Sequence, residues 1–340
     1  MSAAGDTPDT SPGALRLLWE MASGRRPIER SGVWLRAFTG MPAPVRDLAR
    51  WVLRPRQRFL FGRLRALAHD RVMSGPFAGM QLMGRPAPPE LLGSYEHELR
   101  DVMLELGAMP FTTIVNVGAR YGYYAIGLAR LNPLARVLAF EGDAEAHAMF
   151  EAAVRANDAA ARVTVGGFAD TAVFTAALGI GDGVLVVCDI DGGEVPLLDP
   201  VAVPALTRAT ILVECHGPPE TPTEPVMVMR FLPTHEVRRI ATEERVLAHL
   251  PPGAAEPWRS RMPVTLLALM QEHRTPPQSW LLFTPRVSQL LPRNCYRVTA
   301  TAKGEGREGA RRNTWGEQHR ACRSPHWPFF VTLRALRSSR

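Results

Sequence analysis

The sequence predicts an α/β fold in which a mostly parallel sheet carries helices on both of its faces. Short β-branched and apolar runs alternate along the chain with longer runs of helical periodicity, which is typical of this class. The run at 183–188 is apolar on both faces of a strand, as strands inside a parallel sheet are. With 340 residues, of which 46% are hydrophobic, the chain can bury a large core.

Charge divides the chain into an acidic body and two basic ends. Residues 1–75 hold 13 arginines against 6 acidic residues, and residues 293–340 hold 11 basic against 3 acidic residues. Residues 76–292 hold 16 arginines against 24 acidic residues. An acidic body is a poor surface for nucleic acid, so no nucleic-acid partner is expected.

The same scan finds no membrane or secretion signal. No apolar run reaches the roughly 18 residues that cross a bilayer, and the N-terminal residues lack an apolar signal core. The four cysteines are too scattered for a disulfide framework and form no C-x-x-C pair, so reduced thiols and no zinc site are expected. These observations together favour the cytoplasm.

Four segments are predicted along the chain. Residues 1–13 are polar and expected to be disordered, and residues 14–92 form a helical extension. Residues 93–286 form the α/β domain, and residues 287–340 form a basic tail that we expect to be disordered.

The extension contains a basic amphipathic segment at residues 45–68. Leu60 and Leu64 belong to an apolar stripe at helical spacing among seven arginines, and Pro55 predicts a break. Such a segment can lie on an anionic membrane or bind an acidic partner. It can also pack as a cap on the domain and leave its arginines in water, which is the interpretation we favour.

A helix is predicted after Ser94 from apolar residues at i, i+3, i+4 and i+7, which are Leu99, Val102, Met103 and Leu106. Ser94 is its candidate N-cap. Tyr95 and Glu96 would then lie in the first turn, just upstream of the next predicted strand. They are either ligand-site residues or exposed first-turn residues, where the helix dipole favours an acid.

The central prediction concerns the stretch 113–131, which has the pattern of a strand, a turn and a helix. A β-branched run ends at Gly118, Gly122 closes the turn, and an Ala/Leu-rich run follows. Here the helix N-terminus offers free backbone N–H groups, and glycine lets a ligand approach the main chain. The predicted ligand contacts on this turn are Asn116, Gly118, Ala119, Gly122 and Tyr123.

The glycine spacing excludes two common nucleotide-binding loops. In a G-x-G-x-x-G fingerprint the second and third glycines would fall on Arg120 and Tyr123. A Walker loop needs Gly-Lys-Ser/Thr, but no such triplet follows Gly122 and the stretch 113–131 contains no lysine. The bulky turn therefore favours a cofactor without a pyrophosphate.

An acidic residue follows the second predicted strand, at 136–140. Glu141 lies 23 positions beyond Gly118. This is close to the ~20-residue spacing at which an acid binds ribose hydroxyls. The alternative is an exposed acid at a strand end.

Two later strands also end in acidic residues. The run at 183–188 is followed by Asp189 and Asp191, and the run at 209–213 by Glu214 and His216. If these strands are neighbours, three acids and a histidine meet at the carboxyl edge of the sheet, where ligands bind in open α/β sheets. The other predicted elements are helices at 144–156 and 264–272 and strands at 163–165, 236–242 and 279–284.

Four stretches in this order resemble the FkbM-type family of class I S-adenosylmethionine-dependent methyltransferases: VNVGARYGYYAIGLA, VLAFEGDAEAHAMFEAAVRAN, VVCDIDGGEVPLL and ILVECH. The resemblance spans about residues 93–286. It implies a Rossmann-like sheet of seven strands with the last one reversed, S-adenosyl-L-methionine at the glycine turn, and methyl transfer to an oxygen of a sugar or natural product. Asn116 stands where the family has Asp, and Asp191 where its D-x-E-G-x-E motif has the middle Glu.

We therefore expect O-methylation of a small-molecule or glycan hydroxyl. Such a reaction needs in-line approach of the acceptor oxygen and removal of its proton. His216 is the first candidate base because its unperturbed pKa is nearest neutral, and Asp191 is the second. Asp189 would face the amino group of the cofactor or orient His216, and Glu214 is either catalytic or a structural partner of a turn.

Three alternatives accompany this expectation. A divalent metal held by Asp189, Asp191 and Glu214 would suit hard oxygen ligands, but carboxylates beside a cationic amino group need no metal, so none is expected. A catalytically degenerate methyltransferase fold would act as a scaffold or a membrane-associated protein. A nicotinamide oxidoreductase is disfavoured by the glycine spacing.

Overall fold

The computed structural model of the chain describes residues 43–84, 86–216, 222–272 and 278–286, with side chains from residue 54 onward. The predictions for residues 1–42 and for the tail at 287–340 lie outside these ranges. Among the helices within them, none combines the length and the hydropathy that a membrane crossing requires.

A seven-stranded sheet organises the domain, in the spatial order β3-β2-β1-β4-β5-β7-β6. Its strands are β1 (Thr113–Val117), β2 (Arg136–Phe140), β3 (Val163–Gly166), β4 (Val184–Cys188), β5 (Thr210–Cys215), β6 (His235–Ala241) and β7 (Ser279–Pro285). The pairs from β3 to β5 are parallel, whereas β7 runs antiparallel to both β5 and β6. The predicted α/β fold, with seven mostly parallel strands and a reversed last strand, is confirmed.

Helices cover both faces of this sheet, because alternate residues of each buried strand point to opposite sides. Ile114 and Leu185 belong to one core and Val115 and Val186 to the other. The first core is covered by α3 (Ala43–Ala68), α4 (Pro88–Leu92), α5 (Arg100–Ala108), α6 (Tyr123–Leu131), α7 (Ala144–Ala156) and α12 (Pro263–Met270). The second is covered by α8 (Thr171–Leu178), α9 (Glu194–Leu197), the 3-10 helix η3 (Pro204–Arg208) and α10 (Thr223–Phe231).

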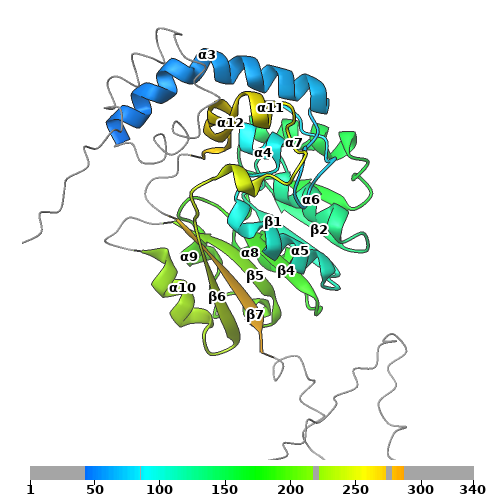
Figure 1. Cartoon of the computed structure of the whole chain (residues 1–340). Helices are drawn as coiled ribbons and strands as arrows, with labels where there is room; N and C mark the ends of the chain where they lie inside the picture. The colour runs from blue at the N-terminus through cyan, green and yellow to red at the C-terminus, as the bar shows by residue number, and fades with distance from the viewer. Residues whose placement is uncertain (1–42, 85, 217–221, 273–277, 287–340) are drawn as a thin grey trace, which may run out of the picture. The chain divides into compact units, whose positions relative to one another are not determined.

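The helix α3 carries the basic segment and lies against α12 (Figure 1). Leu60 and Leu64 are fully buried in the same core as the sheet, while Phe59 is 57% exposed. The predicted break at Pro55 is wrong, since α3 continues through this residue. Proline removes only one backbone hydrogen bond, and the buried leucines hold the following turns in place.

The start of the helix after Ser94 also differs from the prediction. A 3-10 turn, η2 (His97–Leu99), precedes α5, and Ser94 is buried and lies before both. The Ser94 carbonyl instead accepts a hydrogen bond of 3.1 Å from Arg245 Nε. Ser94 is therefore held by a long-range contact, and a turn and a 3-10 helix separate it from α5.

Several helices were missing from the sequence prediction, of which α8 and α10 are the longest, and one helix was predicted too long. Asp170 caps α8 by accepting a hydrogen bond of 2.8 Å from the Val173 amide. The β-branched Thr and Val residues of this short helix weaken its signal in the sequence. The helix α10 was missed as well, and α12 ends at Met270, two residues before the predicted end.

Candidate active site

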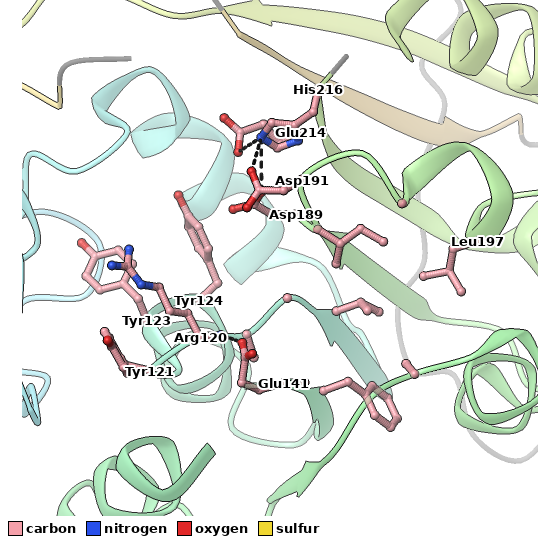
Figure 2. Close-up of a pocket in the computed structure, with 18 of the residues that line it drawn as sticks. Arg120, Tyr121, Tyr123, Tyr124, Glu141, Asp189, Asp191, Leu197, Glu214 and His216 are labelled. Atoms are coloured by element: carbon pink, nitrogen blue, oxygen red, sulfur yellow. Dashed lines mark hydrogen bonds and ion pairs between the residues drawn. The ribbon is translucent and has the colours of Figure 1, made fainter. Parts of the chain in front are cut away.

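A cavity of about 1040 Å³ lies at the carboxyl edge of the sheet. Its walls come from the loops after β1, β2, β4 and β5 and from the segment around α4 (Figure 2). The predicted site residues that line it are Tyr95, Gly118, Ala119, Tyr123, Glu141, Asp189, Asp191, Glu214 and His216. The sequence thus predicted many of the residues that line the cavity. It did not predict several others, including Glu90, Tyr124 and Glu272.

The turn after β1 needs glycine mainly because the chain packs closely there. Gly118 has a φ of 78°, and a Cβ on it would lie 1.6 Å from the Asp189 carbonyl oxygen. Gly122 has a φ of 85°, and a Cβ on it would lie 2.2 Å from the ring of Phe150. The glycine turn is therefore in direct contact with the backbone that follows β4.

The amides of this turn already have acceptors. Those of Gly118 and Ala119 both donate to the Phe140 carbonyl, at 3.1 and 3.0 Å, and that of Gly122 donates to the Ala119 carbonyl. These three residues precede α6, so the free N–H groups expected at the helix N-terminus are not those of this turn. The turn is a poor anion cradle, in agreement with the exclusion of a pyrophosphate cofactor.

Glu141 is held rigidly at the end of β2. Its Oε2 accepts a hydrogen bond of 2.6 Å from the Arg120 amide, and its Oε1 accepts one of 2.7 Å from the Asp143 amide. Each carboxylate oxygen has a further lone pair. The side chain is thus a fixed, negatively charged acceptor on the cavity wall.

Three acids and a histidine meet beside this wall, as predicted, because β4 and β5 are parallel neighbours. His216 Nε2 lies 3.6 Å from Asp189 Oδ1 and 3.5 Å from Asp191 Oδ1 (Figure 2). It also lies 3.3 Å from Glu214 Oε2. We call these residues, together with Glu194, the His216 cluster.

Glu194 contacts His216, and the sequence did not predict this contact. It is the first residue of α9 and is fully buried. Its Oε1 lies 2.8 Å from His216 Nδ1 and accepts a hydrogen bond of 3.1 Å from the Gly192 amide. Its place in the acidic motif was visible in the sequence, but its direction depends on the turn through Gly192, where φ is 107°.

The surrounding carboxylates favour positive charge at the centre of the cluster. Although burial opposes protonation of His216, Glu194 and Glu214 raise its pKa to about 10. Burial and the neighbouring Glu214 raise the pKa of Asp189 to about 8. His216 was the first candidate base because a free histidine has a pKa near neutral. In this environment its pKa is higher, so that reason no longer applies.

Aromatic rings close the other side of the cavity. Tyr95 packs edge-on against Tyr123, with ring centroids 5.4 Å apart, and Tyr124 packs against Trp280. The Tyr124 hydroxyl is buried and has no hydrogen-bond partner among the described residues. In Figure 2 this hydroxyl points to the side of the cavity that holds Asp189.

Three predicted ligand contacts do not line the cavity. Glu96 is 1% exposed, and its amide donates to Glu272 Oε1 at 2.8 Å. Asn116 is also 1% exposed and donates a hydrogen bond of 3.2 Å to the Val187 carbonyl, which ties β1 to β4. Gly122 lies beneath the turn against Phe150.

No known family model and no curated protein matches the chain. Among solved structures, it is similar to an O-methyltransferase from Bacillus cereus (13% identity, 67% of this chain and 90% of that chain, TM-score 0.37). It is also similar to the human methyltransferase 10 domain containing protein (13%, 67% and 96%, 0.41). A third is the precorrin-6y C5,15-methyltransferase of Geobacter metallireducens GS-15 (14%, 56% and 88%, 0.37). The strand order and the reversed β7 give this chain the Rossmann-like fold of class I methyltransferases.

Proposed function

We propose that the chain is an S-adenosylmethionine-dependent methyltransferase that methylates a hydroxyl of a small molecule, sugar or glycan. One observation carries the proposal: a single cavity joins Glu141, fixed at the end of β2, to the His216 cluster at the ends of β4 and β5. The FkbM-type resemblance of the same four stretches supports oxygen as the methylated atom and this family as the finer assignment.

The residues present fit this cofactor. Glu141 offers two fixed acceptors to the ribose hydroxyls, and the His216 cluster offers negative charge to the ammonium and sulfonium groups. A dinucleotide would need free N–H donors for its pyrophosphate, and the amides of Gly118 and Ala119 are already used. When bound, the cofactor supplies an electrophilic methyl group on sulfur.

The residues of the chain then position the acceptor and remove its proton. Asp191 has the most open side chain of the cluster, 95% exposed, and reaches into the cavity. Glu214 lines the same cavity but is nearly buried. We assign the reaction to Asp191, Glu214 and His216 together, with a carboxylate as the proton acceptor and Asp189 oriented toward the cofactor.

Calorimetric titration with S-adenosylmethionine tests the proposal. Glu141→Ala should weaken binding about 10- to 100-fold, as loss of charge-assisted hydrogen bonds does. Glu145→Ala is the matched control, because this acid is exposed on α7 and does not line the cavity. An absence of binding to the wild-type chain at millimolar cofactor would reject the function, and equal affinities of the two variants would reject the role of Glu141.

A further inference from the structure

We infer that Asp189, Asp191 and His216 bind a divalent metal ion, in a site that opens into the cavity. Ion binding does not depend on the proposed function. The part that the ion plays in catalysis rests on the proposed function.

The first support is the spacing of the donor atoms. His216 Nε2 is 3.6 Å from Asp189 Oδ1 and 3.5 Å from Asp191 Oδ1, and one donor atom of each residue lies within 4.8 Å of the others. Donors bound about 2.1 Å from an ion lie about 3.4 Å apart on a tetrahedron and about 3.0 Å apart on an octahedron. Direct N–H···O⁻ hydrogen bonds would be shorter, at about 2.7–2.9 Å.

The second support is the way in which His216 is held. Its side chain is 10% exposed, and its Nδ1 lies 2.8 Å from Oε1 of the fully buried Glu194. A carboxylate on the far nitrogen of a ligating histidine fixes the ring orientation and increases the basicity of the other nitrogen. Glu194 therefore directs Nε2 toward Asp189 and Asp191.

The third support is charge. Among the described residues, His216 is the basic partner in the ion pairs of Asp189, Asp191 and Glu194. The acidic groups of the cluster thus outnumber its single basic group, and two of them are mostly buried. A divalent ion bound by the deprotonated side chains would offset their negative charge.

The site also has an entrance. Asp191 is 95% exposed and takes a left-handed φ of 51°, which is uncommon for a residue other than glycine. Asp189, Asp191 and His216 all line the cavity. Three protein ligands with an open position toward a cavity are the pattern of catalytic metal sites rather than of structural ones.

The donor set narrows the choice of metal. Two carboxylates favour Mg²⁺ or Mn²⁺, whereas an imidazole favours the later ions of the series, including Zn²⁺. A site with both donor types suits Mn²⁺ and Zn²⁺ better than Mg²⁺. Mn²⁺ is the better probe because its binding can be followed directly by electron paramagnetic resonance.

At this place an ion would activate the acceptor. A hydroxyl that coordinates a divalent ion has a lower pKa, as bound water does. Its proton passes to Glu214, which lines the cavity and is not among the three ligands. The oxygen then forms a bond to the methyl carbon while the carbon–sulfur bond breaks and its electron pair stays on sulfur.

The test is a titration of the full-length, chelator-treated chain with MnCl₂ in the absence of S-adenosylmethionine. The spectrum should show one Mn²⁺ bound per chain. Asp191→Asn should weaken binding at least about tenfold, and Glu194→Gln about 10- to 100-fold by disturbing the histidine. Asp101→Asn is the matched control, because Asp101 is an exposed aspartate (89%) outside the cavity.

An unchanged spectrum of free Mn²⁺ with the wild-type chain would overturn the inference, as would equal affinities of Asp191→Asn and Asp101→Asn. The melting temperature of Asp191→Asn should match that of the wild-type chain, so weaker binding would not reflect unfolding. Calorimetry with S-adenosylmethionine in chelator tests the proposed function separately. Cofactor binding without Mn²⁺ binding would reject the metal site alone, and the reverse would reject the proposed function alone.

Discussion

Two clusters of buried charge lie beside the cavity, and they differ in the cation that each contains. The Arg245 cluster holds Arg245, Glu98 and Glu272, whose side chains are 2%, 1% and 8% exposed. Arg245 Nη2 lies 2.7 Å from a carboxylate oxygen of each glutamate, and Nη1 donates to the Glu243 carbonyl. A guanidinium is always charged, so this cluster keeps its cation throughout the pH range in which proteins fold.

The His216 cluster has no permanent cation of this kind. Its nitrogen and oxygen atoms stand 3.3–3.6 Å apart on the cavity side, and Asp191 is open to the cavity. The difference teaches that buried acids alone do not mark a functional site. In the Arg245 cluster the acids surround a permanent cation, which is typical of a structural role. In the His216 cluster the acids surround a titratable ring that faces the cavity, which is typical of a ligand-binding site.

The largest expected effect comes from removing the permanent cation. Arg245→Met removes the guanidinium that faces the buried Glu98 and Glu272 and should lower the free energy of unfolding by about 3–5 kcal/mol, as broken buried ion pairs do. Urea unfolding measures this change. The variant Glu98→Gln/Arg245→Met should recover part of the loss, since one buried charge is gone. A loss below about 1 kcal/mol would show that this cluster, too, adapts to a missing cation.

The second effect concerns the backbone under the His216 cluster. Gly118→Ala places a methyl group where the Asp189 carbonyl lies and demands a left-handed φ of alanine, so it should cost about 2–4 kcal/mol of stability. Because Asp189 must move, Mn²⁺ affinity should fall with stability. Gly167→Ala is the control, because a Cβ added at Gly167 would have no atom within 4 Å. Equal melting temperatures for the two variants would show that the contact between the turn and β4 is adaptable.

The smallest effect comes from an exposed pair that resembles neither cluster. Burial opposes ionisation of Glu224, but hydrogen bonds of 2.6 Å from Arg239 and Ser279 lower its pKa. A lowered pKa in the folded state contributes stability above the unfolded pKa, and this is lost as pH falls through the folded value. Glu224→Gln should therefore cost less than about 1 kcal/mol at pH 7 and less still near pH 4, because Arg239 is 55% exposed. Thermal melts at both pH values measure the difference, and a larger loss at the lower pH would contradict the assignment.

The sequence was sufficient to predict the features that depend on a few neighbouring residues, such as strands and turns. Strand runs, glycine turns and the period-two alternation placed Glu214 and His216 correctly at the end of β5 and beside Asp189. It could not predict the Arg245 cluster, whose members lie far apart in the chain and meet only through tertiary packing. Arg245 also donates a hydrogen bond to the Ser94 carbonyl, and Ser94 is not the helix N-cap that the sequence predicted. The direction of Glu194 depends on backbone angles that residue type does not determine.

The core beneath the cavity also sets the order in which the protein can be built. Leu60 of α3 and Trp280 of β7 belong to one buried cluster, and the Trp280 ring packs against Tyr124 on the cavity wall. During synthesis the first partner emerges from the ribosome long before the last one. β5 therefore lacks its antiparallel neighbour until β7 has been synthesised, so this side of the cavity is completed late in folding.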